Sequence, residues 1–140
     1  DTTIARVSAG VVSVEGVTVA TASNTLSLTN KTLTGLKETK VAVSATEIDL
    51  ATGNYFTKTI SGTTAFTVTN VPSSGTAVSF ILDLTNGGSA TVSFSTGFTS
   101  VKYAGGAAPT LTASGRDVLG FFTHDGGSTW TCLLLGKDVK

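Results

Sequence analysis

The side chains that could perform acid–base chemistry or bind a metal are few and scattered along the chain. The single histidine, His124, is followed by Asp125 and two glycines in a turn. A general base or a metal ligand needs partners that converge on one point, and adjacent turn residues rarely do so. Glu47 and Asp49 would share one face of a strand, as the carboxylates of a glycosidase can. Because no third group supports either pair, we predict no catalytic site, no metal and no cofactor.

The glycine pairs and the lone cysteine also favour structural roles. Gly87-Gly88, Gly105-Gly106 and Gly126-Gly127 each stand between strand-like runs, whereas nucleotide-binding loops lead into a helix. Cys132 has no second cysteine with which to form an intrachain disulfide, and its apolar neighbours favour a buried, inert thiol.

Aromatic side chains next to loops are the remaining candidates for ligand binding. Tyr55 follows Gly53-Asn54, and Tyr103 lies shortly before Gly105-Gly106. Packing in the core is the alternative for both rings, since aromatic side chains bury a large apolar surface. The sequence therefore predicts a binding surface formed by Tyr55, Tyr103 and the turn of His124 and Asp125.

Short runs in which apolar residues alternate with threonine and serine predict strands, and no window has a sustained helical period. We expect strands near residues 48–50, 55–60, 64–69, 78–84, 92–94, 98–103, 118–123 and 129–135. The last two should form a hairpin, and Asn86-Gly87-Gly88 predicts another between 78–84 and 92–94. Strands with turns at short intervals favour an all-β fold, a β-sandwich of jelly-roll-like form.

The first 44 residues differ from the rest. Their valines and leucines, Leu26 and Leu28 among them, alternate in runs that we expect to be too short to form a sheet of their own. We therefore predict an extended arm at residues 1–44, which lies against something else, and a sandwich domain at residues 45–140.

The composition is unusually poor in charge, since only 13% of the 140 residues are charged, and this indicates that partners cover part of the surface within an assembly. The formal net charge is zero, which excludes the basic footprint of a nucleic-acid-binding protein. No stretch has the length and apolarity of a membrane span, and no signal peptide is evident. The chain has no methionine, so we expect a fragment or a processed chain.

The last predicted hairpin has apolar side chains on both faces, although a sandwich strand usually turns one face to water. One face would pack on the second sheet of the domain, and a neighbouring copy would cover the other. An N-terminal strand that folds back is the alternative. Burial of such a side chain is worth about 1.5–3 kcal/mol. We predict an oligomer interface at Leu119, Phe121, Leu133 and Leu135.

Three segments resemble the C-terminal parts of fibre and tail proteins of tailed bacteriophages. They are DTTIARVSAGVVSVEGVTV at residues 1–19, SLTNKTLTGL at 27–36 and FFTHDGGSTWTCLLLGKDVK at 121–140. The resemblance implies a virion structural protein, usually a homotrimer, in which intertwined strands precede a compact β-rich tip. It implies other virion proteins and a host-surface glycan or protein as partners, but it carries over no binding residue. Because the long repetitive shaft of a fibre is missing, a short fibre, a tail-tip component or a head-attached decoration would fit equally well.

The function predicted from the sequence is therefore non-catalytic, namely host-surface attachment and virion assembly in a phage tail or fibre. A monomeric carbohydrate-binding module and a capsid decoration or head-fibre protein stay open as alternatives. A tailspike-like enzyme that cleaves polysaccharide would need clustered acids in a groove, whereas the nine acidic residues are scattered.

Overall fold

The chain divides into two compact units. The computed structural model describes residues 4–8, 11–14, 17–18, 32 and 34–140. Contacts separate Asp1–Leu36 from Lys37–Lys140. The boundary predicted after residue 44 falls inside the second unit, because Lys40–Ala42 is already a strand of its larger sheet. No helix in the described part of the chain is long and apolar enough to cross a membrane.

The first unit contains a small antiparallel sheet. Its strands are β1 (Ile4–Ser8), β2 (Val11–Val14) and β3 (Val17–Thr18), in that order. The expectation that these runs are too short to form a sheet was wrong, because antiparallel strands that are neighbours in sequence need only short connections to pair. The predicted run at Leu26 and Leu28 lies outside the described residues.

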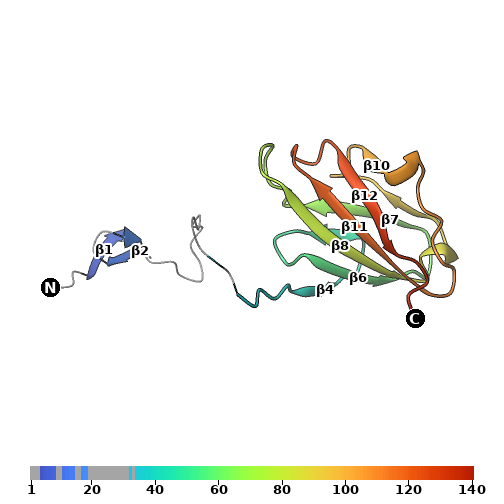
Figure 1. Cartoon of the computed structure of the whole chain (residues 1–140), viewed down its shortest axis with the longest axis horizontal. Helices are drawn as coiled ribbons and strands as arrows, with labels where there is room; N and C mark the ends of the chain where they lie inside the picture. Colours follow the sequence, from blue (N-terminus) through green and yellow to red (C-terminus); the bar gives the residue numbers. More distant parts are fainter. Residues whose placement is uncertain (1–3, 9–10, 15–16, 19–31, 33) are drawn as a thin grey trace. The chain divides into compact units, whose positions relative to one another are not determined.

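The second unit consists of two sheets (Figure 1). The larger is a mixed sheet of six strands in the order β10-β12-β11-β8-β6-β4, and the smaller has the order β5-β7-β9. The strands are β4 (Lys40–Ala42), β5 (Glu47–Asp49), β6 (Tyr55–Thr59), β7 (Thr64–Thr69), β8 (Val78–Thr85), β9 (Val92–Phe94), β10 (Val101–Tyr103), β11 (Arg116–Thr123) and β12 (Trp130–Gly136). Two short 3-10 turns, η1 (Gly87–Ser89) and η2 (Ala104–Gly106), follow β8 and β10. The all-β prediction is therefore confirmed at this level.

From β4 to β9 the chain winds between the two sheets. Successive strands alternate between the large sheet and the small one, so that each pair of strands makes one coil. Neighbouring coils pair in parallel, β4 with β6 and β8 in one sheet, and β5 with β7 and β9 in the other. This winding departs from the expected jelly-roll-like form, which is built from antiparallel strands.

The chain does not form the hairpin predicted at Asn86. Both edges of β8 are occupied, by β11 on one side and β6 on the other, and β9 pairs with β7 in the small sheet. Asn86 does adopt the positive φ (58°) that its residue type tolerates. The turn then continues into η1 and leads the chain across to the opposite sheet. The other predicted hairpin, β11 with β12, is confirmed.

Both sheets contribute to one hydrophobic core. Phe80 of β8 stacks on Phe121 of β11 with a centroid distance of 5.0 Å, and Trp130 of β12 meets Phe80 edge-on at 5.5 Å. Phe94 of the small sheet reaches Phe121 at 4.9 Å, which joins the two sheets. Because the indole nitrogen of Trp130 donates to the carbonyl of Gly97 at 2.9 Å, the polar end of this buried ring is satisfied.

Candidate functional site: a groove on the outer face of the large sheet

The outer face is the side of the six-stranded sheet that turns away from the core. On β8, Phe80, Leu82 and Leu84 are buried in the core, so that Ser79 and Ile81 point outward. On β11, Phe121 pairs with Phe80 and Phe122 pairs with Ser79, so Phe122 and Gly120 also face outward. This alternation places a glycine in the middle of the outer face.

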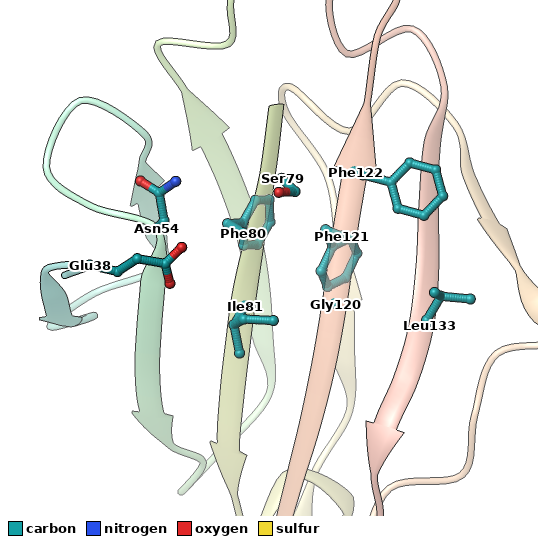
Figure 2. A pocket seen from close by; sticks show the side chains of 9 residues that line it. All are labelled: Glu38, Asn54, Ser79, Phe80, Ile81, Gly120, Phe121, Phe122 and Leu133. Carbon is teal, nitrogen blue, oxygen red and sulfur yellow. The ribbon is translucent and has the colours of Figure 1, made fainter. Parts of the chain in front are cut away.

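A groove of about 190 Å³ lies on this face over β8 and β11. Figure 2 shows Glu38 and Asn54 on one side of it and Phe122 and Leu133 on the other. Gly120 lies between these walls and leaves room for the side chain of Leu135, because a Cβ at Gly120 would come within 2.9 Å of a Leu135 methyl carbon. We call the hollow between the walls the outer groove. Its lining residues are Glu38, Asn54, Ser79, Phe80, Ile81, Gly120, Phe121, Phe122 and Leu133.

A second hollow adjoins the outer groove near the end of the sheet. It has a volume of about 310 Å³ and is lined by Ala77, Val78, Ser79, Phe122, Thr123 and His124. Ser79 and Phe122 belong to both linings, so the Phe122 ring stands between the two hollows.

The predicted interface residues fall into two groups. Leu119 and Phe121 are each 1% exposed and lie in the core, so they offer no surface to a partner. That part of the prediction is corrected, because on β11 it is the alternate residues that face outward. Leu133 and Leu135 are 36% and 55% exposed. Leu134 is 37% exposed although Trp130 and Cys132, with which it alternates, are buried, and the pairing of β11 with β12 shifts register beside it.

Tyr55 lies on β6, and its hydroxyl already has a hydrogen-bond partner within the sheet. It donates to a carboxylate oxygen of Asp83 at 2.8 Å, and Arg116 pairs with the other oxygen at 3.4 Å. The hydrogen bond to Asp83, together with burial, raises the pKa of Tyr55. Tyr55 therefore holds together three strands of the outer face and does not line either hollow.

Tyr103 lies on β10, at the far edge of the large sheet. It lines a small apolar hole of about 50 Å³ between the sheets, together with Phe94 and Leu119. Burial raises the pKa of its hydroxyl. Four strand spacings, on the order of 19 Å, separate β10 from β6, so the structure does not bring Tyr103 and Tyr55 together.

His124 and Asp125 lie in the turn between β11 and β12, but their side chains have different surroundings. One carboxylate oxygen of Asp125 accepts from the Thr129 amide at 2.9 Å and from the Thr123 hydroxyl at 2.8 Å. These two hydrogen bonds lower the pKa of Asp125 and fix the turn. His124 is exposed and borders the second hollow, so it is the one predicted binding residue that lies beside the outer groove.

Glu47 and Asp49, the second carboxylate pair considered from the sequence, have structural partners. Glu47 accepts from the Thr69 hydroxyl, and Asp49 accepts from Asn70 and from the Ala51 amide. The Asn70 and Ala51 hydrogen bonds lower the pKa of Asp49. Burial raises the pKa of the Cys132 thiol to about 12. Among the described residues, no three His, Cys, Asp or Glu side chains gather where they could hold a metal ion.

A comparison of this chain with protein-family models, curated proteins and solved structures finds no match. The outer groove was also missed by sequence reasoning, because its residues span positions 38 to 133 and meet only in the folded unit. Phe122 carried the one usable signal, since it follows a core phenylalanine on the same strand and must therefore face away from the core.

Proposed function

We propose that this chain is a non-catalytic structural component of a phage virion that assembles through β12 and contributes to host-surface attachment. The proposal combines the resemblance to fibre and tail proteins with the distribution of apolar surface. We also propose that the two sheets of the second unit form a β-sandwich tip and that the assembly is a homotrimer. The trimer comes from the resemblance alone, whereas the apolar surface argues only that the chain does not act as a monomer.

The observation that carries the proposal is the position of the exposed apolar side chains. Within residues 37–140, the large hydrophobic residues that remain exposed all belong to the β11–β12 hairpin, namely Phe122, Leu133, Leu134 and Leu135. Scattered single exposed apolar residues are normal, but three consecutive exposed leucines on one strand favour an interaction surface. Because the three leucines are 36–55% exposed, covering what remains of their surface would contribute about 2–4 kcal/mol per copy in total, which favours an oligomer.

A carbohydrate-binding module is the second candidate, and the exposed Phe122 ring beside polar side chains favours it. The two candidates differ in mass in solution. Static light scattering after gel filtration should give a multiple of the 14.1 kDa chain mass if copies assemble. A single-chain mass at micromolar concentration would favour the module and contradict the assembly role.

The assembly surface can be tested with a matched pair of variants. Leu135→Asp places a charge near the end of β12, at an exposed leucine that does not line the outer groove, and should reduce the mass toward that of one chain. Ser93→Asp changes an exposed residue of β9 in the small sheet and should leave the mass unchanged. Antibodies raised against the chain should then label intact particles of the phage that encodes it. Labelling at the head instead of the tail would assign the protein to capsid decoration, and absence of labelling would refute a place in the virion.

A further inference from the structure

We propose that the outer groove and its adjoining hollow bind a neutral saccharide chain, with Phe122 as the stacking platform. This inference rests on the proposed role in host-surface attachment and names the site and the chemical class of the receptor. It replaces the scattered surface of Tyr55 and Tyr103 expected from the sequence.

The Phe122 ring is both exposed and rigidly supported. It is 43% exposed, and its backbone lies in the middle of the sheet, paired with Ser79 on one side and Thr131 on the other. The strand below it is fixed by the stacked pair of Phe80 and Phe121, which are buried in the core. An exposed aromatic ring on a central strand is preorganised to pack against the apolar C–H face of a sugar ring, since little freedom is lost on binding.

Polar side chains stand where the hydroxyl groups of such a sugar would lie. Glu38, Asn54 and Ser79 line the outer groove opposite or beside Phe122 (Figure 2). No hydrogen bond between described residues engages the side chain of any of the three. His124 offers a further ring nitrogen at the second hollow. A carboxylate, an amide and a hydroxyl together provide donors and acceptors for a polyol.

The charge of the lining selects among ligands. None of the residues that line the two hollows is lysine or arginine, and Glu38 provides a carboxylate. A polyanion such as nucleic acid, or a phosphate-rich or acidic polysaccharide, would be repelled by Glu38 and would meet no lysine or arginine in the lining. A neutral saccharide meets neither problem.

The position of the groove argues against an extended peptide. Peptides that bind to sheets usually add a strand at an edge, where unpaired backbone groups are available. The groove lies over β8 and β11, and both are central strands whose two edges are already paired. Recognition here must therefore use side chains, and two hollows of about 190 and 310 Å³ that share Ser79 and Phe122 suit successive sugar rings on either side of one aromatic ring.

The test uses the full chain and an array of neutral and acidic bacterial surface glycans, followed by calorimetry with the neutral oligosaccharide that binds best. Phe122→Ala should weaken binding roughly tenfold, because it removes the stacking surface. Glu38→Gln keeps the shape of its side chain and should alter affinity for that glycan without altering mass. Ser93→Ala, which changes an exposed residue on β9 of the small sheet and so lies away from the groove, should bind as the wild type does.

Several outcomes would overturn the proposal. Absence of binding to every neutral glycan would do so, as would wild-type affinity in both Phe122→Ala and Glu38→Gln. A Phe122→Ala chain that loses assembly while Glu38→Gln binds normally would identify the groove as a contact between copies. The proposed function fails separately, if the wild-type chain is a monomer or does not label virions. In that case, glycan binding that depends on Phe122 would identify a carbohydrate-binding module.

Discussion

Asp117 is the residue whose substitution should test the packing most directly. It is 0% exposed, and three groups donate to its carboxylate. The Thr112 amide donates to Oδ2, whereas the Thr112 hydroxyl and the Asp138 amide donate to Oδ1. Burial alone would raise its pKa, but these hydrogen bonds outweigh burial and hold the pKa below its usual range. Asp117 therefore fastens the loop before β11 and the segment after β12 to the start of β11.

The cost of Asp117→Asn follows from the use of both carboxylate oxygens. An amide has only one oxygen, so at least one donor would face the –NH2 group. Leaving a buried N–H without an acceptor costs about 1–3 kcal/mol, and the remaining bonds lose the strength that a charged acceptor gives. We expect a loss of about 2–4 kcal/mol in the free energy of unfolding at pH 7. Asp125→Asn is the matched control, since both hydrogen bonds to Asp125 go to one oxygen, which asparagine retains.

The pH dependence provides the second half of the test. Because the folded-state pKa of Asp117 is depressed, its stabilisation is fully present above the unfolded value of about 3.9 and is lost as pH falls toward the folded value. The difference in the free energy of unfolding between the wild type and Asp117→Asn should therefore shrink between pH 7 and about pH 3.

Urea unfolding at fixed protein concentration, followed by the fluorescence of the single tryptophan, buried Trp130, measures both quantities. Wild-type stability of Asp117→Asn at pH 7, or a deficit that does not change with pH, would refute the role assigned to this carboxylate.

Three further changes test other parts of the structure. Leu135→Asp should lower the mass measured by light scattering but keep the cooperative unfolding transition, whereas Phe121→Asp should fail to fold, because Phe121 is in the core and an unpaired buried charge is costly; equal behaviour of the two variants would contradict the assignment of faces. The Cys132 thiol should not react with a disulfide reagent at pH 8 until urea unfolds the chain, since burial raises its pKa to about 12; rapid reaction of the folded protein would show that the thiol is accessible. Asn86→Gly should leave the urea midpoint nearly unchanged while Asn86→Val costs about 1–2 kcal/mol, because the backbone there has φ of 58°; equal midpoints would show that this turn tolerates a β-branched residue.

Local pattern determined which residues form strands. The predicted strand at 64–69 coincides with β7, and the β11–β12 hairpin was expected with its turn at His124. These features depend on contacts between residues that are close in sequence, and on the period of two that every strand imposes. Turn chemistry was also predictable at the level of one residue, since Asn86 adopts the positive φ that asparagine tolerates.

Only the tertiary structure decided which strands pair and which side chains share a surface. Asn86 could have closed a hairpin, but β8 finds β6 and β11 as its neighbours, and β9 pairs in the other sheet. The same long-range choice placed Phe121 in the core and Phe122 on the outer face, across the outer groove from Glu38. Strand pairing is settled by the burial of the whole core, which the alternation within one strand does not specify. For this reason the sequence predicted an apolar surface on both faces of the last hairpin but not the groove that lies on one of them.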